Sequence, residues 1–159
     1  MSSQGFEEDI LKFKRGQVVF VAGEPSKHLY IVTKGQVKIF KEEKSRLDLI
    51  SVVGEKDFIG ELSLMEDKLR KVTAIATAET ELIQIKKSEI RRVLEICPDW
   101  VSEIVSTLTD RLRHSIDVLR EHRIEEDLEG LKDDLNPQVL NQFMQSVAEY
   151  RKKKGIKAP

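Results

Sequence analysis

Residues 58–73 contain side-chain types that suit the binding of a small anion attached to a sugar. Gly60 has no Cβ atom, so the backbone there can approach a ligand closely. We expect a short helical turn directly after it, and the free N–H groups that begin such a turn attract negative charge. Arg70 offers a permanently charged fork that matches phosphate oxygens. The Glu61 carboxylate is an acceptor suited to a sugar hydroxyl.

A purely structural explanation of the same residues stays open at this point. Gly60 can simply end a strand, Glu61 can favour the positive end of a helix, and Arg70 can be a solvated surface charge. Short motifs have a high false-positive rate, so their spacing alone does not decide between binding and structure.

Short apolar segments with glycine-bearing turns between them surround this stretch. Segments rich in β-branched and aromatic residues predict strands. We expect strands over residues 18–21, 29–32, 37–40, 47–53, 72–76 and 80–85, after a short helix that ends near Phe13. The pattern predicts a mainly β fold with added helices: an antiparallel β-roll or jelly roll with flanking helices and a long C-terminal helix.

Two helices are predicted after the last strand. Ser88 is a good N-cap for the first, which is broken at residues 97–99. Asp99 caps a long helix that runs to about Asp127 and has a near-heptad apolar seam, which packs either on the sandwich or on a second copy of the chain. The seam consists of Val101, Ile104, Val105, Leu108, Leu112, Ser115, Ile116 and Leu119. Ser115 is its polar exception, either a tolerated small residue or a hydrogen-bonding group that meets a ligand.

The chain changes character after Gly130. Asn136 and Pro137 are a suitable cap and first turn for another helix, and Gly155 is a suitable end. Cations at residues 151–154 complement the dipole of that helix and are weak evidence for a nucleic-acid or membrane surface. We therefore predict two units, residues 1–127 with the sandwich and the long helix, and residues 128–159 as a helical extension.

Composition narrows the class of protein. The 159 residues are 40% hydrophobic and 35% charged with a net charge of −1, which gives no overall basic field for nucleic acid or membrane. The lone Cys97 excludes an internal disulfide and, with a polar N-terminus unlike a secretory signal, predicts a cytoplasmic location. The scattered His28, His114 and His122 have no metal-ligand spacing, so a metal enzyme on a jelly roll is a weak hypothesis. We expect neither enzyme activity, nor a metal, nor a cofactor.

The strands, turns and binding stretch together resemble the cyclic-nucleotide-binding domain. This is the sensor module of bacterial cyclic-AMP receptor proteins and of the regulatory subunits of cyclic-AMP-dependent kinase. The resemblance covers roughly residues 13–123 and rests on several ordered pieces, which are more specific together than any one alone. They are Gly23-Glu24, Leu29-Tyr30-Ile31-Val32 with Gly35 and Val37, Gly54 with residues 57–62 and Leu64, and Arg70 ten residues after Gly60.

The resemblance implies a role for each matching residue. Residues 60–64 would cradle the cyclic phosphate, Glu61 would accept from the ribose 2′-hydroxyl, and Arg70 would pair with a phosphate oxygen. The implied phosphate and ribose site is Gly60, Glu61, Leu62, Ser63, Arg70 and Lys71. The implied pocket wall is Ile39, Ile50 and Val53 together with Leu62, and the implied base contact is Ser115 with Ile116.

Two features depart from the family pattern. Lys71 and Val72 stand where the family usually has small residues, and Lys71 can act as a point charge for phosphate, fill the site, or fit a second phosphate such as that of a cyclic dinucleotide. About 35 residues follow the long helix, too few for the winged helix-turn-helix of the bacterial receptors, so we do not expect DNA binding.

The resemblance implies a stand-alone sensor that binds a cyclic mononucleotide, cyclic AMP first of all, and signals through its C-terminal helices to an unknown protein effector. It also implies a homodimer formed through residues 99–127. The alternative is a ligand-free dimerisation or scaffold module, or a sensor of another cyclic mononucleotide or dinucleotide.

Overall fold

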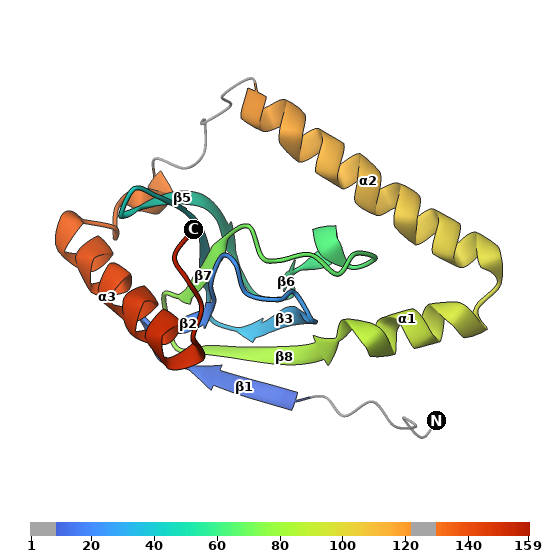
Figure 1. Cartoon of the computed structure of the whole chain (residues 1–159), viewed down its shortest axis with the longest axis horizontal. Helices are drawn as coiled ribbons and strands as arrows, with labels where there is room; N and C mark the ends of the chain where they lie inside the picture. Colours follow the sequence, from blue (N-terminus) through green and yellow to red (C-terminus); the bar gives the residue numbers. More distant parts are fainter. Residues whose placement is uncertain (1–8, 122–129) are drawn as a thin grey trace.

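The computed structural model describes residues 9–121 and 130–159, and its centre is a pair of four-stranded antiparallel sheets (Figure 1). One sheet has the strand order β1-β8-β3-β6 and the other has the order β2-β7-β4-β5. The strands are β1 (Asp9–Phe13), β2 (Val18–Phe20), β3 (His28–Lys34), β4 (Val37–Glu43), β5 (Arg46–Val53), β6 (Phe58–Ile59), β7 (Thr73–Ala76) and β8 (Thr80–Lys86). The helices are η1 (Glu61–Ser63), α1 (Lys87–Ile96), α2 (Asp99–Glu121), η2 (Gly130–Lys132) and α3 (Pro137–Lys154). These elements confirm the predicted mainly β roll with flanking helices.

The space between the two sheets holds one core. Strand residues of both sheets alternate in direction, so every second side chain points inward. The buried members of this inner core are Val19, Phe20, Tyr30, Val32, Val37, Ile39, Val53, Ile59, Ala74 and Leu82.

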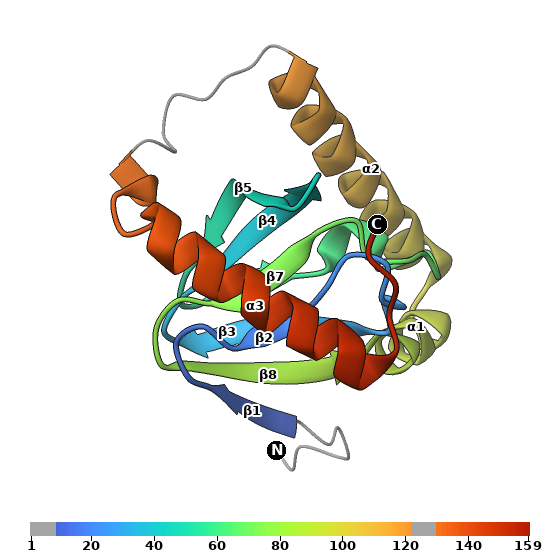
Figure 2. The same cartoon turned by 60° about the vertical axis from the view of Figure 1, so that its left-hand side comes forward.

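A second core lies on the outer face of the β2-β7-β4-β5 sheet, under α3 (Figure 2). Phe143 and Val147 of α3 are buried there against Phe40 and Ile75. Both faces of this sheet are covered where α3 crosses it, and every residue of β2 and of β7 is buried.

The ends of α3 are as predicted. The side chain of Asn136 accepts from the N–H of Val139 at 2.9 Å, Pro137 occupies the first turn, and Gly155 ends the helix at a φ of 69°. The structure shows that this segment folds back on its own sandwich. The predicted boundary between residues 127 and 128 lies outside the described residues.

The predicted N-terminal helix is wrong over the described residues, because residues 9–13 form strand β1. Ile10 pairs with Ile83 and Leu11 with Leu82 of β8. Leu11 and Phe13 pack on the inner core while Ile10 is 61% exposed. This alternation has the two-residue period of a strand.

Helices α1 and α2 follow the sandwich as predicted, with two differences. Helix α1 begins at Lys87 rather than after Ser88 and has no side-chain cap at Lys86. The predicted continuation of α2 to residue 127, and with it His122, lies outside the described residues. No helix in the described ranges is long and apolar enough to cross a membrane.

Candidate functional site

The predicted turn is present directly after β6. Gly60 has a φ of 104°, in the left-handed region that favours glycine, and the helical turn η1 follows it. A Cβ atom on Gly60 would lie 3.0 Å from Arg70 Nη1 and 3.1 Å from the carbonyl oxygen of His28. Glycine is therefore required here for two reasons, the backbone conformation and the close approach of Arg70.

Arg70 is buried beside this turn. Its side chain is 8% exposed, and its Nη2 donates to the carbonyl oxygen of His28 at 2.6 Å. The guanidinium lies 4.0 Å from the centre of the Phe20 ring. Its buried Nε has no hydrogen-bond partner, and no carboxylate within the described ranges forms an ion pair with it. Burial lowers the pKa of Arg70.

The backbone of Arg70 is fixed by the loop after β2. Its N–H donates to the carbonyl oxygen of Glu24 at 2.7 Å, and its own carbonyl oxygen accepts from Gly23 at 2.7 Å. The Gly23-Glu24 pair therefore holds the residue that carries the guanidinium.

Glu61 is the other charged member of the site and is half-buried. Burial raises the pKa of Glu61, and nearby Asp57 adds to this effect, whereas main-chain N–H groups and Arg70 oppose it. Glu61 and Arg70 do not form an ion pair with each other in the described structure. A desolvated cation and a desolvated acceptor thus lie near one turn without neutralising each other.

Ser63 ends the turn and contacts a residue that the sequence analysis did not select. Lys87 is 2% exposed, and its Nζ donates to Ser63 Oγ at 2.6 Å, to the Ser63 carbonyl oxygen at 2.9 Å and to Ser26 Oγ at 2.6 Å. Burial lowers the pKa of Lys87 to about 8, and repulsion from Arg70 and Arg91 contributes. In the sequence Lys87 is one lysine among many, so only the tertiary structure reveals it.

Lys71 is exposed and does not fill the site. The predicted wall residues Ile39 and Val53 are buried in the inner core, while Ile50 and Leu62 are half-buried. Ile39 of β4 and Val53 of β5 therefore face the interior of the β-roll that also carries the turn.

Among the described residues, no hydrogen bond joins the predicted base contact to the turn. Ser115 is exposed, and its hydroxyl donates back to the carbonyl oxygen of Arg111 at 2.9 Å, as serine often does inside a helix. Ile116 is half-buried. A role of either residue toward a base stays a prediction.

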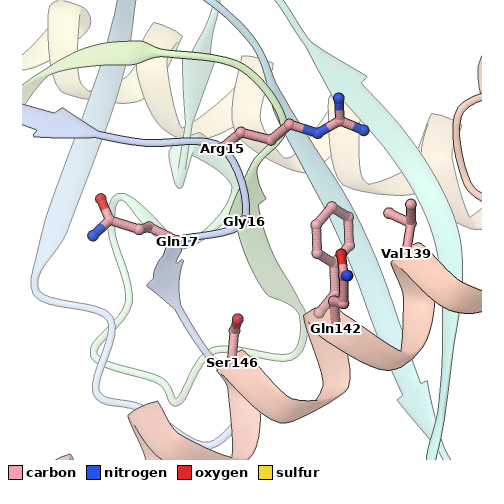
Figure 3. A pocket seen from close by; sticks show the side chains of 7 residues that line it. Arg15, Gly16, Gln17, Val139, Gln142 and Ser146 are labelled. Atoms are coloured by element: carbon pink, nitrogen blue, oxygen red, sulfur yellow. The ribbon is translucent and has the colours of Figure 1, made fainter.

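Two hollows lie elsewhere on the surface. One, of about 380 Å³, is between the turn that contains Arg15 and the α3 residues Gln142 and Ser146 (Figure 3). The other, of about 520 Å³, is an open depression on α2 beside His114 and Ser115. Within the described residues, no group of His, Cys, Asp and Glu side chains could hold a metal ion.

Comparison with known proteins identifies the family of this fold. The family model described as "Cyclic nucleotide-binding domain" matches residues 10–97. The CRP-like cAMP-activated global transcriptional regulator of Mycobacterium tuberculosis is 31% identical over 104 residues, 65% of this chain and 46% of that protein. The chain thus matches less than half the length of that relative.

Two solved structures have the same fold. The N-terminal domain of a transcriptional regulator from Streptomyces coelicolor superposes with a TM-score of 0.58 at 30% identity, over 69% of this chain and 79% of that one. The sensor domain of the transcriptional regulator DNR from Pseudomonas aeruginosa superposes with a TM-score of 0.61 at 24% identity, over 70% of this chain and 75% of that one.

Proposed function

The chain belongs to the cyclic nucleotide-binding domain family, and from this premise we propose that it is a sensor that binds a cyclic mononucleotide, with cyclic AMP as the first choice. The phosphate would meet Arg70 and the N–H groups of the turn after Gly60, and the ribose would meet Glu61. Leu62, Ser63 and Lys71 would complete the phosphate and ribose site. Binding would be reported through the helices to a protein effector.

One observation supports this proposal more than any other. Arg70 is a buried guanidinium with an unpaired Nε and no ion pair to a carboxylate of the described residues, and it lies against the glycine that opens the turn. A buried unpaired cation is unfavourable, and a phosphate provides both a counter-charge and acceptor oxygens.

The position of Lys71 distinguishes among the alternatives. The ligand-free hypothesis placed the Lys71 amine in the phosphate site, and its exposure argues against that version. An exposed lysine at the edge of the turn leaves room for a ligand with a second phosphate, so a cyclic dinucleotide stays the second candidate.

Ligand binding is the direct test of the proposal. A ligand at 100 times its Kd adds about 2.7 kcal/mol of stability. We expect cyclic AMP in large excess to raise the melting temperature by several degrees, and calorimetry to give one site per chain. Cyclic GMP, a cyclic dinucleotide and linear AMP should be compared in the same assay. No shift with any cyclic nucleotide would instead support a scaffold module.

We also propose binding without catalysis, with no metal or further cofactor and no DNA contact by this chain. The Mycobacterium tuberculosis relative is a cAMP-activated regulator and the Streptomyces coelicolor structure is a domain of a regulator, which supports the binding role. The cytoplasmic location stays a prediction of the sequence.

The homodimer predicted through residues 99–127 has specific support in α2. The helix carries an exposed apolar row with four-residue spacing, formed by Trp100, Ile104, Leu108 and Leu112. Val101 and Val105, which the sequence placed in the same seam, are half-buried instead. The row and the half-buried valines thus divide the predicted seam between two faces, and we propose that the row meets α2 of a second copy.

Changing Leu108→Glu together with Leu112→Glu is expected to convert a dimer into a monomer, because two charges would lose water in the interface. Light scattering after size exclusion measures the mass. Asp117→Lys, an exposed change on the opposite side of the helix, is the control. A wild-type chain that is monomeric at high micromolar concentration would contradict the dimer.

A further inference from the structure

Three consecutive carbonyl groups of the binding turn each accept a hydrogen bond from a cationic side chain. Arg113 Nη2 of α2 donates to Leu62 O at 2.6 Å. Lys87 Nζ of α1 donates to Ser63 O at 2.9 Å, and Arg91 Nε of α1 donates to Leu64 O at 3.2 Å. We call Lys87, Arg91 and Arg113 the carbonyl clasp.

The clasp acts at the opposite end of the turn from Gly60. The last carbonyls of a helical turn have no partner within it and carry partial negative charge. Cations complement that charge, and charge-assisted hydrogen bonds are stronger than neutral ones. All three bonds are made at Leu62, Ser63 and Leu64, so the clasp does not use the Gly60 end of the turn, beside Arg70.

Acidic residues of the following loop hold two of the cations in place. Asp67 accepts from Arg91 Nη2 at 2.8 Å and from Arg91 Nη1 at 3.2 Å. Arg113 Nη2 lies 3.5 Å from a Glu66 carboxylate oxygen, and its Nη1 lies 3.1 Å from Asp110. The two arginines therefore link the turn and its loop to α1 and α2, which begin at Lys87 and Asp99.

We propose that Lys87, Arg91 and Arg113 are positioning residues that tie the turn to α1 and α2, so that a change in the turn and a change in the two helices occur together. The proposal rests on the proposed function, since it names the residues by which that site communicates with its helices. Because such coupling is reciprocal, a contact that favours one helix position must also change ligand affinity.

The chain contains a natural reporter for the helices. Trp100 is its single tryptophan, and it lies at the start of α2, 61% exposed. Its emission responds to a change in its surroundings without any added label, and the same measurement in the Leu108→Glu, Leu112→Glu variant separates helix movement from a change in the proposed dimer contact. We expect cyclic AMP to change Trp100 emission in the wild type, at concentrations that follow the calorimetric Kd.

Arg113→Met and Arg91→Met are the test variants, since each keeps most of the apolar stem and removes the charge. Arg111→Met and Arg92→Met are matched controls, because both arginines are exposed and lie on the same two helices. Lys87 is left unchanged because it is buried and its loss can unfold the domain. Circular dichroism checks that each variant is folded.

The clasp variants are expected to bind cyclic AMP about tenfold more weakly, consistent with the loss of one charged hydrogen bond. They are also expected to lose most of the Trp100 response at saturating ligand, while the controls match the wild type. A wild type that binds without a Trp100 change, or clasp variants with wild-type affinity and response, would overturn the inference.

Hydrogen exchange separates failure of the inference from failure of the proposed function. In the free protein, residues 60–66 are expected to exchange faster in Arg113→Met and Arg91→Met than in the wild type and the controls. If no cyclic nucleotide binds the wild type, the proposed function fails. The role of the clasp is then tested only by the hydrogen-exchange rates of residues 60–66 in the free protein. Unchanged exchange in both clasp variants would then refute it.

Discussion

Arg70→Gln is expected to weaken cyclic AMP binding by at least about 100-fold, equivalent to about 2.7 kcal/mol. Removing one partner of a buried charge pair typically costs about 3–5 kcal/mol. Glutamine keeps the backbone hydrogen bonds of residue 70 to Glu24 and Gly23, so the loop is retained while the charge and the donor to the His28 carbonyl are lost. Isothermal titration calorimetry measures the change.

The same substitution is expected to leave the free protein within about 1 kcal/mol of the wild-type free energy of unfolding. Without a ligand, the Arg70 cation is buried with an unpaired Nε, and burial lowers its pKa. Relief of that desolvation offsets the lost contact with the Phe20 ring, which is worth about 0.5–2 kcal/mol. Urea denaturation measures the second quantity.

Lys68→Gln is the control because Lys68 is an exposed lysine of the same loop and lies outside the proposed site. It removes an equal charge two residues away and should change the affinity far less. Two results would contradict the assignment of Arg70: an unchanged Kd in Arg70→Gln, or losses in binding and in stability of the same size.

Local chemistry made the turn predictable from the sequence, whereas the role of Arg70, ten residues later, was implied only by the resemblance to the family. Gly60 needs its positive φ, and Asn136 with Pro137 defines a helix start, whatever the rest of the chain does. Each of these signals lies within a few residues of the feature it predicts.

Lys87, Arg91 and Arg113 could not be found in the same way. Each is an ordinary cation on a helix, and its role depends on carbonyls more than 20 residues earlier in the chain.

The sequence predicted one apolar seam along α2, and the structure divides these residues between two faces for a related reason. A helix with one side on a sandwich divides its apolar residues between two faces, so Val105 is half-buried while Leu108 is 57% exposed.

A buried ion pair between Arg151 and Glu42 attaches α3 to the sheet. No local sequence pattern predicts this pair, because its two residues lie far apart in the chain. Arg151 Nη2 lies 2.6 Å from Glu42 Oε1 of β4, with side-chain exposures of 8% and 10%. Arg151 Nη1 donates to the carbonyl oxygens of Ala22 at 3.0 Å and Lys157 at 2.7 Å. Thr73 Oγ1 donates to the same Glu42 oxygen. One side chain therefore joins α3, the loop after β2 and the sheet.

Arg151→Met is expected to lower the free energy of unfolding by about 3–5 kcal/mol, since it leaves the Glu42 carboxylate buried without its cation. Lys152→Met, at the exposed neighbouring position, should change it by less than about 0.5 kcal/mol. Urea denaturation of both variants measures the difference.

A double-mutant cycle with Glu42→Leu separates the ion pair from the other contacts of Arg151. Glu42→Leu with Arg151→Met removes both charges together, so the double variant should be less destabilised than the sum of the two single changes. It should not regain full stability, because the carbonyl groups of Ala22 and Lys157 lose their donor. Additive effects of the two changes would mean that α3 is held by Phe143 and Val147 in the outer core and not by this pair.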